Sequence, residues 1–298
     1  MQWMCGKAQA NGIELAYQEL GGNSAPAILL IMGFASQLTV WPEAFCQSLA
    51  AAGYRVIRFD NRDVGLSHKV YDQVPPGIVG LRLRSSLRLP IRAPYTLDDM
   101  CADAVALLDV LNIERAHIVG ASMGGMIGQL MAINYPERVA SLVSMMSSSG
   151  YGGMKPAVLM HFMKKPKAHR VAQISHALKT WQLISSPEFG DPEPQLRARI
   201  AAAYERNHYP AGKARQLAAI VASGNRKKLL SKISAPTLVI HGDKDPMLSL
   251  KGARDTAQRI PNARLEIIPG MGHDLPTAML ERLVNLILGH VDAVKMAG

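Results

Sequence analysis

The fold is decided by the stretch Ala116-His117-Ile118-Val119-Gly120-Ala121-Ser122-Met123-Gly124-Gly125-Met126-Ile127. An apolar run reaches a serine between two glycines, and the chain continues in a helical pattern. The spacing Gly120-x-Ser122-x-Gly124 matches the nucleophile elbow, in which a strained turn from a strand into a helix raises a serine hydroxyl above the sheet. The pattern predicts a buried strand before Ser122, a helix over residues 126–134 and a reactive serine between them. A glycine-rich turn without chemistry is the alternative interpretation.

Apolar runs and helical patterns alternate along much of the remaining chain. Asn11-Gly12 is a strong two-residue hairpin signal and predicts two antiparallel strands within residues 4–20. Strands that alternate with helices favour an α/β fold with a mostly parallel sheet and flanking helices. Further strands are expected at residues 27–31, 55–59, 141–146, 237–241 and 264–268, and helices at residues 42–52, from the capping box of residues 96–99 to residue 111, at 250–260 and at 277–290.

The pattern changes between residues 149 and 230, where helical segments follow one another without a strand. Helices are expected there at residues 157–162, 171–184, 196–206 and 213–222, with prolines between them. We therefore expect three parts: a first part of the α/β core at residues 1–148, a helical cap at 149–230 and a second part of the core at 231–298.

The composition is that of a folded chain with a basic surface. Of its 298 residues, 48% are hydrophobic, enough for a large core. Lys and Arg number 33 against 23 Asp and Glu, but the charges are scattered and no nucleic-acid motif occurs, so a nucleic-acid partner is not expected. The net charge of +10 gives only a weak argument for steering anionic substrates.

The cysteines and the apolar stretches bear on location. Cys5, Cys46 and Cys101 are odd in number and lack metal-binding spacing, which argues against a disulfide framework or a zinc site and favours a reducing compartment. The first residues lack a signal-peptide pattern, and no apolar stretch reaches the roughly 18 residues of a membrane span. We expect a cytoplasmic protein without an integral membrane segment.

Two polar segments have open interpretations. In the loop over residues 60–67, we expect the charges to pair with one another beside the rim of the site. In residues 70–95, apolar residues alternate with arginines. This segment could be a surface-lying arm, a homodimer contact, part of the pocket wall or an exposed loop. The arginines are Arg82, Arg84, Arg88 and Arg92.

A serine nucleophile needs a base beside it and an acid that orients the base. In an elbow fold the order along the chain is serine, acid, histidine, each on a loop after a strand. His273 follows the last expected strand in a glycine-rich loop and is the candidate base, with His241 as its rival. For the acid, the spacing Gly242-x-x-Asp245 favours Asp245 over Asp243.

The oxyanion that forms during acyl transfer needs two hydrogen-bond donors. We expect them to be the backbone N–H groups of Met123, which follows the nucleophile, and Phe34, which follows the strand at residues 27–31. We expect the apolar substrate to contact Gly33 and, from the cap, Met154, Phe162 and Trp181.

These motifs, in this order over nearly the whole chain, resemble the α/β-hydrolase superfamily. Met32-Gly33, Trp41-Pro42, the segment from Arg58 to Ser67 and Pro269-Gly270-Met271-Gly272-His273 resemble the aclacinomycin methylesterase-like carboxylesterases. The resemblance implies an eight-stranded α/β-hydrolase sheet with a helical cap insertion. It also implies hydrolysis of small to medium hydrophobic carboxylic esters through an acyl-enzyme, with no organic cofactor and no metal.

Other functions use the same serine, acid and histidine. A lactone hydrolase, a carbon-carbon-bond hydrolase and a cofactor-free perhydrolase are alternatives within one mechanism. A ligand-binding receptor of the same fold is the alternative from a different class.

Overall fold

The computed structural model describes residues 1–296 except 72–74, 76, 78–79, 82, 85–86, 88 and 151–152. In this part of the chain, eight strands form one sheet in the order β1-β2-β4-β3-β5-β6-β7-β8. The hairpin of β1 and β2 is antiparallel and joins β4 at one edge, and the strands from β4 through β8 run parallel. The expected sheet is confirmed, with strands β1 (Met4–Ala10), β2 (Ile13–Leu20), β3 (Ala27–Ile31), β4 (Arg55–Phe59), β5 (Ala116–Ala121), β6 (Val139–Met145), β7 (Thr237–Gly242) and β8 (Arg264–Ile268).

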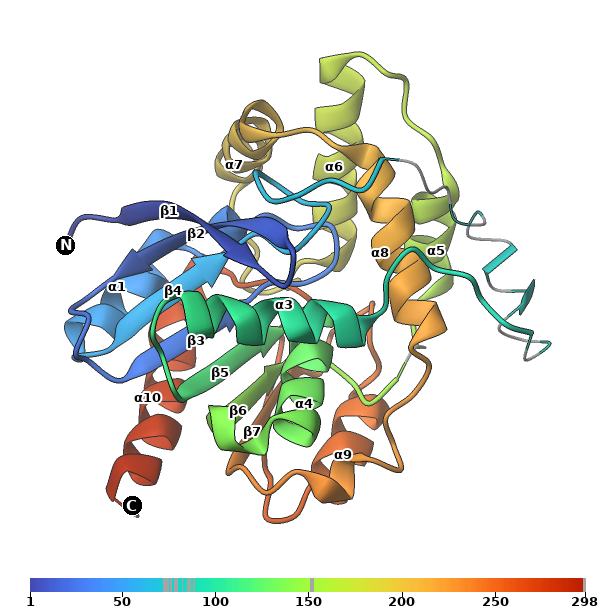
Figure 1. Ribbon diagram of the computed structural model, residues 1–298. Helices are drawn as coiled ribbons and strands as arrows, with labels where there is room; N and C mark the ends of the chain where they lie inside the picture. Colours follow the sequence, from blue (N-terminus) through green and yellow to red (C-terminus); the bar gives the residue numbers. More distant parts are fainter. Residues whose placement is uncertain are drawn as a thin grey trace.

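Helices cover both faces of the sheet, which explains why its central strands read as continuous apolar runs. In Figure 1, α3 and α4 lie in front of the sheet and α10 lies behind it. One buried cluster joins the sheet to α3 and α4, and a second joins its other face to α1 and α10. These core helices are α1 (Glu43–Ala51), α3 (Leu97–Val110), α4 (Met123–Asn134), α9 (Leu250–Arg259) and α10 (Leu280–Met296).

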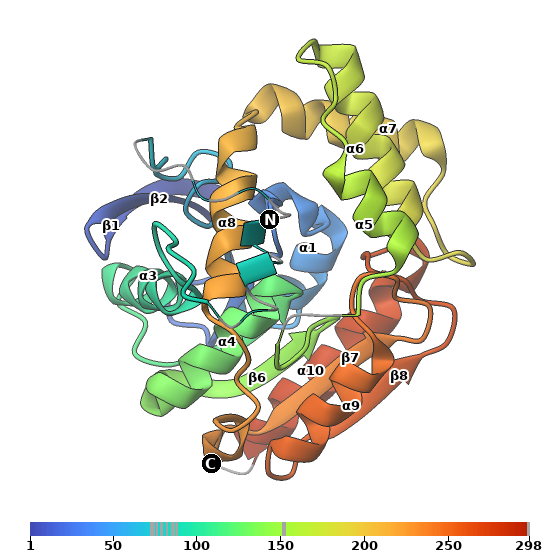
Figure 2. The ribbon, with the colours of Figure 1, turned by 90° about the vertical axis from the view of Figure 1, so that its right-hand side faces the viewer.

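Helices α5 to α8, which we call the inserted helices, lie between β6 and β7 in the chain and gather on one side of the sheet (Figure 1). Helices α5, α6 and α7 pack in sequence, whereas α8 stands apart from them (Figure 2). The inserted helices are α5 (Pro156–Met163), α6 (Arg170–Ile184), α7 (Glu193–Arg206) and α8 (Pro210–Ala222). Their helical character agrees with the expectation, and their standing as a separate cap domain stays a prediction.

Several helices start earlier than expected. Helix α4 begins at Met123, directly after Ser122, rather than at residue 126. Helices α7 and α8 hold Pro194 and Pro210 in their first turn, where a missing N–H costs no hydrogen bond. The prolines therefore open these helices instead of separating them.

None of the helices within the described residues is long and apolar enough to cross a membrane.

Candidate active site

Ser122 occupies the turn between β5 and α4. Its φ of 55° and ψ of −117° belong to a region that costs a non-glycine residue about 1–3 kcal/mol. The flanking glycines permit the turn, because a Cβ on Gly124 would lie 1.9 Å from the oxygen of Ile31 and one on Gly120 would lie 2.2 Å from the oxygen of Gly124. The N–H of Ser122 donates to the oxygen of Met145 at 2.9 Å. This hydrogen bond fixes the turn to β6, while Ser122 itself stays partly exposed.

The structure brings Ser122, His273 and Asp245 together from the ends of three strands. His273 Nε2 lies 3.0 Å from Ser122 Oγ, and His273 Nδ1 lies 2.7 Å from Asp245 Oδ2. A carboxylate only accepts hydrogen bonds, so Nδ1 carries the proton and Nε2 is left to accept from the serine hydroxyl. This arrangement can remove a proton from Ser122.

The Asp245 side chain is fully buried. Its Oδ1 accepts the N–H groups of Met247 at 2.7 Å and Leu248 at 2.9 Å, so the carboxylate cannot turn away from His273. Burial alone would raise the pKa of Asp245, but the charge and the hydrogen bond of His273 outweigh it and hold the pKa below its usual value. Asp245 is therefore ionised at neutral pH.

The two rival residues have other contacts. His241 Nε2 donates to the oxygen of Leu248 at 3.0 Å, and burial lowers the pKa of its imidazole. Asp243 Oδ1 accepts the N–H of Gly270 at 2.8 Å and thereby supports the loop that carries His273. Within the described residues, neither side chain has a hydrogen bond with Ser122 or His273.

The residues expected to form the oxyanion hole lie beside the nucleophile. Met123 is the first residue of α4, where N–H groups lack a partner inside the helix. A Cβ on Gly33 would come within 3.0 Å of the Ser122 Cβ, which places the loop after β3 against the serine. No hydrogen bond among the described residues uses the N–H of Phe34 or Met123, so both can point to a ligand.

The inserted helices hold the loop of His273. At the end of α6, the oxygen of Ile184 accepts the N–H of His273 at 2.7 Å. Ser186 Oγ accepts the N–H of Gly272 at 2.8 Å and donates to Asp274 Oδ1 at 2.6 Å. Burial raises the pKa of Asp274, and its hydrogen bonds with Ser186 oppose that rise.

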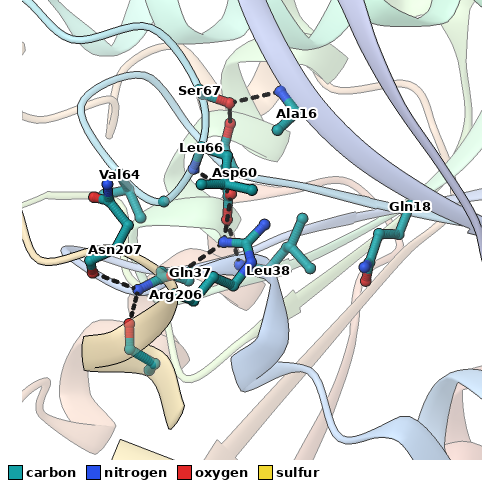
Figure 3. A network of polar contacts seen from close by, with 12 residues as sticks. Ala16, Gln18, Gln37, Leu38, Asp60, Val64, Leu66, Ser67, Arg206 and Asn207 are labelled. Carbon is teal, nitrogen blue, oxygen red and sulfur yellow. Dashed lines mark hydrogen bonds and ion pairs between the residues drawn. The ribbon is translucent and has the colours of Figure 1, made fainter. Parts of the chain in front are cut away.

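Asp60 connects the core to α7, as Figure 3 shows. Its fully buried carboxylate accepts the N–H groups of Leu38 at 2.8 Å and Leu66 at 2.9 Å, and Arg206 Nη1 donates to it at 2.7 Å. The same Arg206 nitrogen donates to Gln37 Oε1 at 2.6 Å. The expectation that the charges of residues 60–67 pair with one another was wrong for Asp60, because its partner comes from an inserted helix.

A second buried pair connects the same loop to α8. Asp63 Oδ2 accepts from Arg215 Nε at 2.8 Å and from the Tyr95 hydroxyl at 2.6 Å. Arg62, between the two aspartates, pairs instead with Asp103 of α3 at 2.6 Å. The loop therefore joins the inserted helices to the core.

The residues expected to bind substrate lie in different surroundings. The Phe162 ring lies 6.4 Å from the Phe34 ring, which brings α5 over the loop of the expected oxyanion hole. Half-buried Met154 precedes Lys155, whose N–H donates to the oxygen of Pro246 beside the acid loop. Trp181 packs instead against the buried cluster shared by α6 and α7. A role of these residues in substrate binding stays a prediction.

The arginine-rich segment is described only in part, because Arg82 and Arg88 lie outside the described residues. Arg84 Nη1 donates to the oxygen of Pro90 at 3.2 Å. The described residues contain no group of three or more His, Cys, Asp or Glu side chains that could hold a metal ion.

Comparison with known proteins places this site in a family. The chain is 29% identical to rhodomycin D methylesterase DauP of Streptomyces sp. strain C5 over 94% of its own length and 96% of that protein. It is equally 29% identical to rhodomycin D methylesterase DnrP of Streptomyces peucetius, with 94% and 96% covered. The solved enol-lactonase of Burkholderia xenovorans LB400 shares the fold, with a TM-score of 0.76 at 22% identity over 96% of this chain and 100% of that chain. Residues 26–276 match the model of the alpha/beta hydrolase fold, and the chain belongs to that family.

Proposed function

We propose that this protein is a serine carboxylesterase that hydrolyses small to medium hydrophobic carboxylic esters through an acyl-enzyme intermediate. The observation that carries the proposal is the continuous line of contacts from Asp245 through His273 to Ser122. A serine hydroxyl is a weak nucleophile at neutral pH, and a neutral imidazole within hydrogen-bond distance activates it.

In the first half-reaction, Ser122 Oγ attacks the ester carbonyl while His273 Nε2 takes the hydroxyl proton. The carbonyl π electrons move to the oxygen, and the N–H groups of Phe34 and Met123 stabilise the resulting oxyanion. The tetrahedral adduct then expels the alkoxide leaving group, which receives the proton from His273. The acyl group stays on Ser122.

In the second half-reaction, His273 removes a proton from water, whose oxygen attacks the acyl carbon. Collapse of the second adduct breaks the bond to Ser122 Oγ and returns the proton to that oxygen. Asp245 orients the imidazole and stabilises its charged form in both halves, while it remains ionised itself.

The surroundings of Ser122 support an apolar acyl group. Phe34 lies in the loop after β3, Phe162 lies in α5, and Met154 lies two residues before α5; each is half-buried. The two relatives named above are methylesterases, which supports an ester of a carboxylic acid as the substrate class.

We also propose a cytoplasmic location. It is supported by the three free cysteines, of which Cys46 and Cys101 are buried, because free thiols persist in reducing compartments.

The test is rapid mixing of the purified protein with p-nitrophenyl butyrate. An acyl-enzyme predicts a burst of p-nitrophenol of one equivalent per chain when deacylation is the slower half, followed by steady turnover. Ser122→Ala should abolish both phases while circular dichroism and the thermal midpoint show an intact fold. Comparable turnover by folded Ser122→Ala protein would refute the proposal.

A further inference from the structure

The connection between α6 and α7 lies against the loop that carries His273. We call residues 184–192 the α6–α7 connection and residues 269–276 the base loop. In Figure 2, α5, α6 and α7 stand above the part of the core that holds β7 and β8, and β8 runs directly into the base loop. The two segments are far apart in the sequence, yet they meet on both sides of His273.

The backbones of the two segments are in direct contact at Gly272. A Cβ on Gly272 would lie 2.6 Å from both the oxygen of Ile184 and the nitrogen of Ser186, closer than a real Cβ comes to such atoms. The N–H of His273 donates to the oxygen of Ile184 at 2.7 Å, and the N–H of Gly272 donates to Ser186 Oγ at 2.8 Å. The backbone N–H groups of Gly272 and His273 are therefore both directed to the inserted part of the chain.

The Ser186 hydroxyl is at the centre of this contact. It accepts the N–H of Gly272, and it donates to Asp274 Oδ1 at 2.6 Å. The same Oδ1 accepts the backbone N–H of Ser186 at 3.0 Å. Ser186, His273 and Asp274 are all buried. Because Ser186 binds the residue before His273 and the residue after it, it fixes the backbone on both sides of the imidazole.

The core holds the start of the base loop. Asp243 Oδ1 accepts the N–H of Gly270 at 2.8 Å, and the N–H of Lys244 donates to the oxygen of Met271 at 3.0 Å. Directly after the base loop, the N–H of Thr277 donates to Asp191 Oδ1 of the α6–α7 connection at 3.1 Å. The base loop is thus anchored to the core before His273 and to the inserted part at His273 and beyond it.

A general base acts only within hydrogen-bond reach of its proton, at about 2.6–3.2 Å. The 3.0 Å between His273 Nε2 and Ser122 Oγ leaves little room for a shift of the base loop. We propose that Ser186 is a positioning residue for His273: its hydroxyl, together with Asp274, holds the base loop so that Nε2 stays within reach of Ser122. The proposal rests on the proposed function, in which His273 is the general base. The inserted helices then help to determine whether the base is in place.

The test is steady-state kinetics of Ser186→Ala with p-nitrophenyl butyrate. A misplacement of about 1 Å can cost about 10²-fold in rate, so we expect kcat to fall about tenfold or more. KM should stay within about twofold of the wild-type value, because the lost interaction serves the chemical step. Ser231→Ala is the matched control: it removes a hydroxyl at an exposed position of the 3-10 turn Leu230–Lys232 and should leave both constants unchanged. Circular dichroism verifies that each variant is folded.

Conservative variants keep the hydrogen bonds and should keep most of kcat. Asp274→Asn retains an oxygen that can accept both donors of Ser186, whereas Asp274→Ala should lower kcat as Ser186→Ala does. Ser186→Thr retains the hydroxyl, and the extended backbone favoured before Pro187 suits a β-branched residue. The double variant of Ser186→Ala and Asp274→Ala should be about as slow as either single variant, because the two side chains act as one unit.

The reaction of Ser122 with diisopropyl fluorophosphate tests the base without an ester. Ser122 Oγ displaces fluoride from phosphorus while His273 takes the hydroxyl proton, so the second-order rate constant depends on the same contact. We expect Ser186→Ala to lower this rate constant by about the same factor as kcat, about tenfold or more.

The outcomes separate the positioning role from the esterase activity. Ester turnover with an unchanged kcat in Ser186→Ala, or with a change in KM alone, overturns the role of Ser186 and leaves the esterase intact. If no ester is hydrolysed, the proposed function fails, and diisopropyl fluorophosphate then decides the role of Ser186. A slower reaction in Ser186→Ala would support that role, while equal rates or an unreactive wild-type protein would overturn it.

Discussion

Gln216 Oε1 accepts a hydrogen bond from the backbone N–H of Ala35 at 2.8 Å, which links helix α8 to the loop that carries the expected oxyanion donor. Gln216 is fully buried, and its Nε2 donates to the oxygen of Arg62 at 2.9 Å, so both ends of the amide are engaged. Ala35 has a φ of 54°, a left-handed conformation that is uncommon for alanine. The hydrogen bond that the Ala35 N–H donates to Gln216 stabilises this conformation and thereby the direction of the Phe34 N–H.

Gln216→Leu is expected to reduce kcat more than it changes KM. The oxyanion exists only after the substrate carbonyl has been attacked, so a misdirected Phe34 N–H weakens transition-state binding. Complete loss of one oxyanion donor lowers kcat by a factor of about 10²–10³, so a displaced donor should lower kcat about tenfold. Steady-state kinetics with p-nitrophenyl butyrate measures both constants.

Gln195→Leu is the matched control, because Gln195 is exposed on α7. It should leave both constants near their wild-type values. A Gln216→Leu protein with normal kcat and a raised KM would show that Gln216 affects only substrate binding.

The local part of the structure was predictable from the sequence. The apolar run at residues 27–31 forms β3 with every side chain buried, and the hairpin turns at Asn11 and Gly12, both with positive φ. The capping box at Thr96 and Asp99 is present as expected. Such signals arise from neighbours in the chain, whose spacing is visible in the sequence.

The contacts that join the site to the inserted helices were not predictable. Ala35 and Gln216 are 181 residues apart, and Asp60 and Arg206 are 146 apart. No periodicity or turn preference relates residues at such separations. The role of Ser186 in holding the His273 loop was not visible in the sequence either, because a serine in a loop can have many roles and its partner Asp274 lies 88 residues away.

Asp245→Asn should lower kcat by up to about 10⁴, because an asparagine can hold the imidazole with its proton on the wrong nitrogen. Asp243→Asn should have a much smaller effect, since its amide oxygen can still accept the N–H of Gly270. The pair is a matched comparison, because both variants replace a carboxylate by an amide in one loop. A larger loss of kcat in Asp243→Asn would reassign the acid.

Asp60→Asn is expected to lower the free energy of unfolding by about 3 kcal/mol, because it deprives partly buried Arg206 of its carboxylate. Urea unfolding at pH 7 measures the loss. Glu193→Gln breaks the exposed pair with Arg197 and should change the free energy of unfolding by less than about 0.5 kcal/mol. Equal effects of the two substitutions would show that the Asp60 pair does not stabilise the fold.

The free energy of unfolding should decrease as the pH falls from about 7 to about 5, the range that surrounds the ordinary histidine pKa. Burial is the first cause that lowers the pKa of His290, whose Nε2 donates to the oxygen of Pro236 at 3.2 Å. The unfolded chain then binds more protons than the folded chain between the folded and the ordinary pKa, so stability rises with pH there.

His290→Gln should make that pH dependence shallower, by at most about 1.4 kcal/mol per pH unit, the limit for one proton. Urea midpoints from pH 7.5 to pH 5.0 give the slope for each variant. His68→Gln, at an exposed position, should keep the wild-type slope. A His290→Gln slope equal to that of the wild type would place the titrating group elsewhere.

Phe162→Ala should reduce activity toward longer acyl chains more than toward acetyl esters. Each buried methylene contributes about 0.8 kcal/mol, close to fourfold in kcat/KM, so the wild-type protein should improve from acetyl to butyryl or hexanoyl p-nitrophenyl esters. Removing the ring that faces Phe34 takes away part of the apolar wall that the longer chains contact. Val171→Ala, at an exposed position of α6, should leave the profile unchanged. If Phe162→Ala lowers kcat/KM by one common factor for every chain length, the ring supports the loop of the oxyanion hole instead of contacting the acyl chain.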